Sequence, residues 1–290
     1  MVDPTILSRP PMAALRPFID VFWASAGAPS PLPEAPRLER MLPTGTMHVV
    51  LRLSDAPVRI RGAAPDGDWD ELRHGIVGGA RSTFHLRDPV AHGAAVGALL
   101  RPGGARLLLP HAGADELAQR HVALADVIGP AATMLLRERL ADEPGAAARI
   151  TLLEAFFAAR LPLVKGMHPA VAELLAALER AAPVGAAVAA SGLSHRHVIA
   201  HFRRAVGLAP KAFQRVCRFQ GVIRAMQASP RAPLADVALA GGYSDQSHFQ
   251  REFAAITGIT PGEYRRLAPV LPNHLPLSPG NQGQFRARRR

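Results

Sequence analysis

The chain is poor in cysteine and in aromatic residues. Its 290 residues include one cysteine, Cys217, and 5% aromatic residues. One cysteine cannot build a disulfide framework, a four-cysteine zinc site or an iron–sulfur cluster, which fits a reducing compartment. The hydrophobic content is nonetheless 48%, so the composition is that of a folded protein.

Long apolar runs are absent as well. No uninterrupted run reaches the roughly 18 residues that a membrane span needs, and the first residues lack the basic and apolar regions of a secretory signal. We therefore expect a cytoplasmic protein with no membrane partner. The length allows one large domain or two ordinary ones.

The sequence also lacks the common catalytic motifs: a nucleophile elbow, a phosphate-binding loop, a dinucleotide-binding glycine motif and a cluster of metal ligands. A DNA-repair methyltransferase would need a reactive cysteine in its own motif and usually a cysteine-based zinc site. His197 and His201 have the spacing of a zinc pair, but no glutamate lies between them and no third ligand is evident. We expect no enzyme activity, no cofactor and no metal.

What the sequence does have is positive charge at one end. Residues 166–290 hold 16 basic and 6 acidic side chains, whereas residues 1–165 hold 18 and 17. Part of the excess lies in the arginine-rich last residues, but the segment stays basic without residues 269–290. A basic domain beside a nearly neutral one predicts a polyanionic partner.

The periodicity divides the chain into a strand-rich and a helical part. Alternating apolar residues predict a half-buried strand at 47–53, and short runs bounded by Gly, Pro or Asp predict strands near 58–61, 75–77, 83–86 and 95–100. Apolar residues that recur at steps of three and four residues predict helices near 104–109, 114–120, 125–141 and 146–160. A Pro-rich loop at 29–36 precedes the strands, and a linker is predicted at 161–166. The fold class is therefore α+β, with a β-rich domain at 1–162, a helical domain at 168–268 and a disordered basic tail at 269–290.

The helical domain contains an internal repeat. Gly192, Ser194, Phe202, Gly207 and Pro210 have counterparts about 50 residues later, in Gly242, Ser244, Phe253, Gly258 and Pro261. The offset changes from 50 to 51, which we attribute to one inserted residue in the second helix of the later copy. Each copy reads as a short helix, a turn with Gly and a second helix, which is a helix-turn-helix unit.

The residues of each unit have local roles. Ser194 and Ser244 are predicted N-caps, and the two prolines stand where a following helix starts. A long helix from Pro210 to about Ala228 would join the units. Its predicted buried stripe is Phe213, Val216, Cys217, Ile223 and Met226. A plain repeat of helical hairpins without a nucleic-acid role remains the alternative.

Residues 168–268 resemble the DNA-binding domain of the AraC/XylS family of bacterial transcription regulators. The resemblance rests most on Gly242-Tyr-Ser-Asp-Gln-Ser-His-Phe-x-Arg251-x-Phe253 and on Gly258-Ile-Thr-Pro-Gly-Glu-Tyr-Arg265. It implies that two helix-turn-helix units enter successive major-groove segments of promoter DNA. The first copy departs from the family pattern at Ala200, where many members have a basic residue.

Side chains that project from the apolar face of each second helix are the candidate DNA contacts. Glutamine suits adenine and arginine suits guanine. The candidates are Arg196, His197, Arg203 and Arg204 in the first unit and Gln246, Ser247, Gln250 and Arg251 in the second; Ser194 and Ser244 would cap their helices near phosphate. A solvated helix face is the alternative for each. His248 is expected to pack or cap.

Residues 1–160 resemble, more loosely, the sensor-type domains of some regulators of this family, through Leu42-Pro-Thr-Gly45 and Leu100-Arg-Pro-Gly-Gly104. That resemblance implies a cupin-like barrel that senses a small-molecule effector or forms a homodimer. His48, Arg52, His85 and Arg101 could line its pocket, or simply face solvent. RNA polymerase is the expected partner, and an activator the expected kind of regulator. An interaction module acting as a corepressor or anti-activator remains the alternative.

Overall fold

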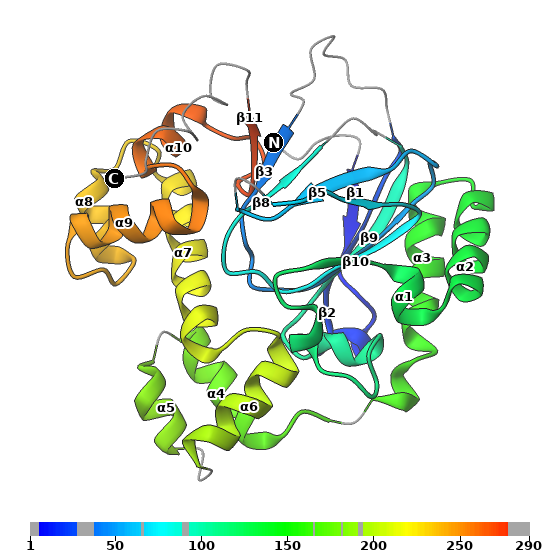
Figure 1. Ribbon diagram of the computed structural model, residues 1–290, viewed down its shortest axis with the longest axis horizontal. Coiled ribbons are helices and arrows are strands. Elements are labelled where there is room, and N and C mark those ends of the chain that lie inside the picture. The colour runs from blue at the N-terminus through cyan, green and yellow to red at the C-terminus, as the bar shows by residue number, and fades with distance from the viewer. Residues whose placement is uncertain are drawn as a thin grey trace.

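The computed structural model describes residues 6–27, 38–64, 67–88, 93–164, 166–180, 182–190 and 194–277. It confirms the α+β class: a β-rich N-terminal domain lies beside a group of C-terminal helices (Figure 1). The predicted Pro-rich loop at 29–36 lies outside the described residues. No helix in the described ranges has the length and apolar character needed to cross a membrane.

The first sheet of the N-terminal domain has the strand order β1-β2-β9-β4-β7-β10, and neighbouring strands are antiparallel. Its strands are β1 (Ile6–Arg9), β2 (Ile19–Ser25), β4 (His48–Arg52), β7 (Gly75–Gly78), β9 (Ala95–Leu100) and β10 (His121–Ala123). We call it sheet A. Val49 and Leu51 of β4 are fully buried, as the alternating pattern predicts.

The second sheet, sheet B, has the order β11-β3-β8-β5-β6 and is also antiparallel. It consists of β3 (Leu38–Met41), β5 (Val58–Arg61), β6 (Asp70–Leu72), β8 (His85–Arg87) and β11 (His274–Leu277). The structure corrects the prediction of a disordered tail from residue 269. Residues 274–277 pair with β3, and Leu275 is fully buried.

Short helices complete the N-terminal domain. The predicted helices near 104–109 and 114–120 are single 3-10 turns, η2 (Gly104–Leu107) and η3 (Ala114–Leu117); η1 (Ala13–Leu15) is another. Gly129 and Pro130 divide the predicted helix 125–141 into α1 (Leu124–Ile128) and α2 (Pro130–Asp142). Helix α3 (Ala146–Ala158) packs on β2 and β9. Glu154 of α3 accepts hydrogen bonds from Arg9 and from the Met12 N–H, which fixes the helix to the N-terminal strand.

The C-terminal helices follow a 3-10 turn, η4 (Leu161–Leu163), within the predicted linker. They are α4 (Pro169–Glu179), α5 (Val184–Ala190), α6 (His195–Val206), α7 (Pro210–Ala228), α8 (Leu234–Ala240), α9 (Gln246–Thr257) and α10 (Pro261–Leu267). Helix α7 has the predicted bounds. Its buried side includes Phe219 and Val222, which the prediction missed, whereas Cys217 is only half-buried.

The hydrophobic cores run across the boundary between the two domains. Phe202 of α6 and Phe213 of α7 belong to the same cluster as the strands of sheet A. Phe249 and Phe253 of α9 share a second cluster with Phe84 beside β8 and with Leu275 of β11. In Figure 1, α7 accordingly spans the distance between a lower and an upper group of helices beside the sheets. Each helix-turn-helix unit therefore packs on a different part of the N-terminal domain.

Candidate nucleic-acid interface

The second helix of the first helix-turn-helix unit, α6, begins as the sequence predicts. The Ser194 hydroxyl accepts a hydrogen bond from the His197 N–H and also lies 3.1 Å from His197 Nδ1. A serine at this position satisfies one of the free N–H groups of the first helical turn. The turn that precedes it, with Gly192 and Leu193, lies outside the described residues.

The corresponding helix of the second unit, α9, begins one residue later than predicted. Its N-cap is Asp245, whose carboxylate accepts from the His248 N–H at 2.7 Å; Ser244 instead donates to Asp245. Helices α6 and α9 have the same length, 12 residues each. The inserted residue therefore lies in the turn before the helix and not within it, because Asp245 takes the place that Ser194 has in the first unit.

Both helices end in the same way. Gly207 and Gly258 have φ values of 90° and 72°, in the left-handed region that glycine adopts without strain. Each donates its N–H to the carbonyl four residues earlier. Pro210 and Pro261 then open α7 and α10, where a missing N–H costs least. The repeat seen in the sequence is thus a structural repeat.

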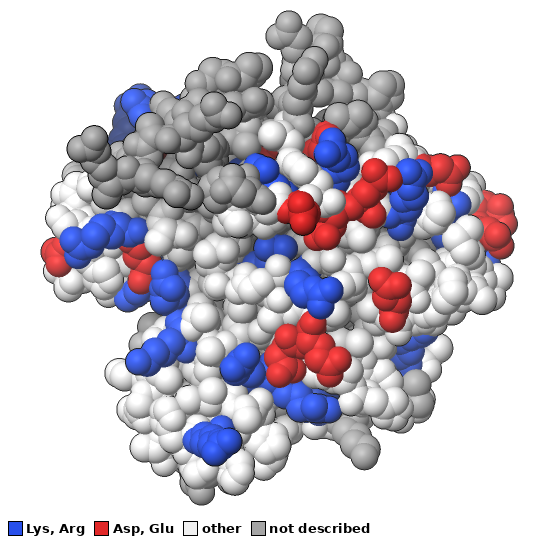
Figure 2. All heavy atoms as spheres, viewed as in Figure 1, with Lys and Arg blue, Asp and Glu red and all other residues white. Residues whose placement is uncertain are grey.

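All eight candidate DNA contacts are exposed: Arg196, His197, Arg203, Arg204, Gln246, Ser247, Gln250 and Arg251. They lie opposite buried residues such as Val198 and Phe202 in α6 and Phe249 and Phe253 in α9. Figure 2 shows Lys and Arg over the C-terminal helices, at the left, with the acidic side chains mostly over the N-terminal domain. Arg204 also donates to the His111 carbonyl, at 2.9 Å, and so contacts the N-terminal domain.

A largely buried carboxylate that the sequence analysis missed holds α9 in place. Glu252 accepts from Arg218 at 2.6 Å, from Arg215 at 3.3 Å and from the Tyr243 hydroxyl at 3.0 Å. Burial, and then the charge of Glu252, raise the pKa of Tyr243. Two arginines three residues apart on the joining helix were the available signal, since they share one face of α7.

The remaining C-terminal candidates have structural partners. His197 bonds Ser194, while the His201 ring stacks on His168, so the two histidines do not face a common point. Among the described residues, no group of His, Cys, Asp and Glu side chains is arranged to hold a metal ion. The His248 ring packs on Tyr243. Burial raises the pKa of the Cys217 thiol to about 11, so it is a poor nucleophile near neutral pH.

The four pocket candidates of the N-terminal domain separate into two groups. His48 and His85 come together around His121, with ring centroids 5.4 and 4.5 Å from that ring. Arg101 instead pairs with Asp20 at the surface, and Arg52 bonds Ser54. No local pattern marks His121 as a site residue, because it lies on the three-residue strand β10.

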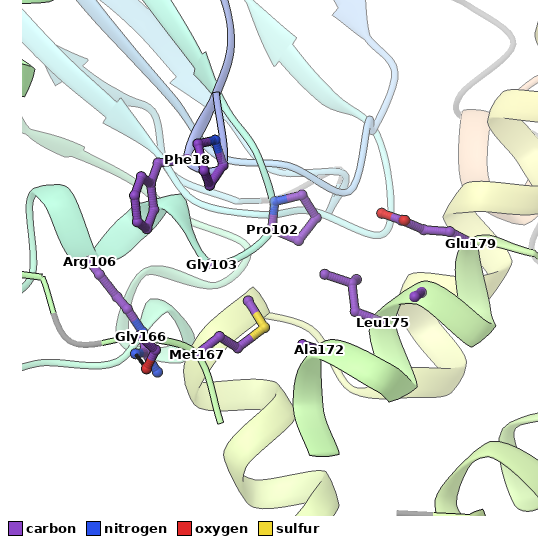
Figure 3. Close-up of a pocket in the computed structure, with 11 residues that line it drawn as sticks. Phe18, Pro102, Gly103, Arg106, Gly166, Met167, Ala172, Leu175 and Glu179 are labelled. Carbon is purple, nitrogen blue, oxygen red and sulfur yellow. Dashed lines mark hydrogen bonds between the residues drawn. The ribbon is translucent and has the colours of Figure 1, made fainter. Parts of the chain in front are cut away.

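A separate pocket of about 410 Å³ lies between the N-terminal domain and α4 (Figure 3). Phe18 and Pro102 approach it from the N-terminal domain, and Leu175 approaches it from α4, with Met167 between them. The Arg106 guanidinium donates to the Gly166 carbonyl beside it. The lining is mainly apolar and comes from both domains.

Two family models match the chain. Residues 187–267 match a helix-turn-helix domain, and residues 8–123 match a domain of unknown function, DUF6597. One curated relative is the HTH-type transcriptional regulator MtrA of Neisseria gonorrhoeae, 33% identical over 79 residues. The match covers 27% of this chain and 26% of MtrA, so it spans about a quarter of the length of that relative.

Solved structures of ToxT from Vibrio cholerae are similar at low identity. The apo form of one ToxT variant has a TM-score of 0.46 and 9% identity, covering 92% of this chain and 99% of that one. Wild-type ToxT with a bound unsaturated fatty acid has a TM-score of 0.43 and 9% identity, covering 91% and 95%.

Proposed function

The chain belongs to the AraC/XylS family by its helix-turn-helix domain, and from this premise we propose that it is a sequence-specific, DNA-binding transcription regulator. The observation that carries the proposal is the structural repeat. Helices α6 and α9 have equal length, equivalent caps and exposed polar faces on one basic domain. Two such helices joined by α7 suit two segments of the major groove.

Within this proposal, the exposed candidates of the two units contact DNA in different ways. Gln246, Gln250 and Arg251 read base edges in the second unit, because amide and guanidinium groups can bond a base at two points. Arg196 and His197 face the groove in the first unit. Arg203 and Arg204, in the last turn of α6, lie nearer the phosphates, as do the capped starts of both helices.

The N-terminal domain would bias this docking, in response to a small effector or a second subunit. The shared cores support the idea, since a change in either sheet reaches one helix-turn-helix unit directly. An effector in the pocket beside α4 would touch both domains at once. RNA polymerase is the expected partner at the promoter, in the cytoplasm, and no catalytic step is part of the proposal.

Selection of bound sequences from random DNA, with the full-length protein and over a series of salt concentrations, tests the function. We expect a motif in two short blocks about one helical turn apart. Replacement of Gln246 and Arg251 by Ala should remove the block read by α9. Arg73→Ala is the control, because it removes one exposed positive charge from the N-terminal domain.

Two single substitutions separate base readout from phosphate binding. Arg251→Ala should weaken specific binding by about 1–3 kcal/mol and relax one base position. Arg203→Ala should weaken binding to all sequences alike and lower the salt slope by about one. Equal losses on specific and random DNA for both variants would contradict the assignment. Binding that only follows salt, with no enriched motif, would instead favour the interaction-module alternative.

A further inference from the structure

A cluster of buried nitrogen groups lies between the two sheets, apart from the pocket beside α4. His48 on β4 and His121 on β10 come from sheet A, His85 on β8 comes from sheet B, and Arg81 lies in the segment that joins β7 to β8. Arg81, His85 and His121 are exposed by only 8%, 8% and 5%. We call these four residues the inter-sheet cluster.

One hydrogen bond determines the protonation of His121. Arg81 Nη2 lies 3.4 Å from His121 Nδ1, and a guanidinium can only donate. His121 Nδ1 is therefore the acceptor, and the proton of the neutral ring lies on Nε2. That Nε2–H group is buried and has no hydrogen-bond partner among the described residues.

The same holds for two further atoms of the cluster. Arg81 Nε and His85 Nδ1 are also buried without a hydrogen-bond partner in the described ranges. A buried donor without an acceptor is costly, at about 1–3 kcal/mol, so native proteins rarely leave several in one place. Arg81 Nε and the His121 Nε2–H are two such donors, and His85 Nδ1 is a third unpartnered nitrogen beside them, so the cluster indicates a site for an acceptor.

The charge of the cluster has one sign. Burial lowers the pKa of His121 to about 2 and that of His48 to about 4, so both rings are neutral near pH 7. Burial also lowers the pKa of Arg81, to about 10, which still leaves it charged. No ion pair with Arg81 is found among the described residues, although the charge of the Asp70 carboxylate raises its pKa against the effect of burial. Another acidic group on the neighbouring strands, Glu39, is engaged by Arg87 and His274.

We propose that the inter-sheet cluster binds a small oxyanion, the carboxylate or phosphate group of an effector. The ligand would accept from Arg81 Nε and from the His121 Nε2–H, and His85 Nδ1 would supply a third contact. Buried donors beside a charged guanidinium that forms no ion pair among the described residues are complementary to such a group. This assignment rests on the proposed function only in treating the ligand as an effector.

The segment that carries Arg81 and His85 also contacts the ends of α6 and α9. Ala80 lies against Gly207, the residue that ends α6; a Cβ built on that glycine would come within 3.2 Å of the Ala80 side chain. Phe84 lies against Gly258, the residue that ends α9, and donates its N–H to the Ile256 carbonyl at 2.9 Å. An anion held between residues 81 and 85 would therefore fix the segment that touches both helix-turn-helix units.

Titration of the full-length protein with sodium phosphate, sodium benzoate or sodium chloride at constant ionic strength tests the site. In thermal unfolding, phosphate or benzoate should stabilise the protein saturably and more than chloride does. The salt whose titration saturates shows whether the site prefers a phosphate or a carboxylate group. Arg81→Met should weaken that response at least about tenfold, since it removes a charge-assisted hydrogen bond. Arg101→Met, at the surface of the same domain, should leave it unchanged.

A measurement on the wild-type protein covers the case in which Arg81→Met does not fold. The Nε2 resonance of the His121 ring should shift saturably with the same anion and with the same affinity. Stabilisation that follows ionic strength alone, or an unmoved His121 resonance, would overturn the site. Neither readout includes DNA, so failure of DNA binding and failure of the anion site remain distinguishable.

Thermodynamic linkage between anion binding and DNA binding tests whether the anion regulates the protein. If the anion acts through residues 80–84, it must change the affinity for the selected DNA, and the DNA must change the affinity for the anion by the same factor. Arg81→Met should abolish this coupling, so that phosphate or benzoate no longer changes the DNA affinity of the variant. Saturable anion binding with no effect on DNA affinity would overturn the effector role.

Discussion

The two helix-turn-helix units share their local design but differ in what holds them. Helix α6 packs on η2 and η3, and its Arg204 bonds the His111 carbonyl of the N-terminal domain. Helix α9 is held by the largely buried Glu252 and shares a hydrophobic cluster with Phe84 and with Leu275 of β11. Equal sequence signals therefore build equal helices, whereas the surroundings make the first unit dependent on sheet A and the second on sheet B.

Because of this difference, the N-terminal domain contacts the two helix-turn-helix units at separate places. A change near η3 would act on the first unit, and a change near β8 or β11 would act on the second. The segment from Ala80 to Phe84 reaches both, because it contacts Gly207 and Gly258. Substitutions that affect one unit and spare the other are the means of testing this comparison.

The largest effects are expected from the core phenylalanines. Phe202→Ala and Phe253→Ala should each lower the free energy of unfolding by about 3–5 kcal/mol, because both side chains are fully buried. Denaturant unfolding measures this. Since each core is shared with the N-terminal domain, we expect one cooperative transition in both variants.

Leu239→Ala is the control, since this side chain is 76% exposed and its loss should change stability by less than about 0.5 kcal/mol. Two separate unfolding transitions, with the sheets still folded in either variant, would show that the helices and the sheets do not share a cooperative core.

An intermediate effect is expected from the carboxylate that only the second unit has. Glu252→Gln removes the negative charge that Arg215 and Arg218 contact, and should lower stability by about 1–3 kcal/mol. In sequence selection, the DNA block read by α9 should weaken while the block read by α6 persists. Glu173→Gln, at an exposed position on α4, is the matched control. Equal weakening of both blocks would show that the units are not held independently.

The smallest effects concern the helix caps, and they differ in pH dependence. Ser194→Ala should cost about 1 kcal/mol at any pH, because a hydroxyl cap does not titrate. The hydrogen bond from the His248 N–H, followed by that from Ser244, holds the pKa of Asp245 below its ordinary 3.8. The charged cap therefore stabilises fully above that value and is lost as the pH falls through the lower folded pKa.

Unfolding measured between pH 7 and pH 3 checks this contrast. The difference in the free energy of unfolding between the wild type and Asp245→Ala should shrink only at the acid end of this range. Ser244→Ala should cost less than Asp245→Ala, because Asp245 makes the bond to the helix. The reverse order would restore Ser244 as the cap.

Several patterns that depend on neighbouring residues alone predicted the structure correctly. Helix α7 and the strands β5 and β9 have the predicted bounds, since Pro210 marks a helix start and Gly, Pro or Asp residues bound the two strand runs. The caps were predictable in kind. The position of the second cap was wrong because two adjacent residues, Ser244 and Asp245, are both good caps and only the full helix length decides between them.

Features that depend on distant partners were missed. Strand β11 contains Pro276, which argues against a central strand but is tolerated at the edge position that β11 occupies. The association of His121 with His48 and His85 depends on how two sheets face one another, and no local pattern encodes that. The role of Glu252 likewise needs α7 and α9 side by side.

The pairing of β11 with β3 has a consequence for how the protein is made. Residues 38–41 are synthesised early, whereas residues 274–277 follow both DNA-binding units. Until then β3 has β8 as its neighbour on one side and an open hydrogen-bonding edge on the other. Domains fold from the N-terminus as the chain is synthesised, and open edges invite pairing with other chains. The nascent protein is therefore more open to pairing with other chains before β11 covers the free edge of β3.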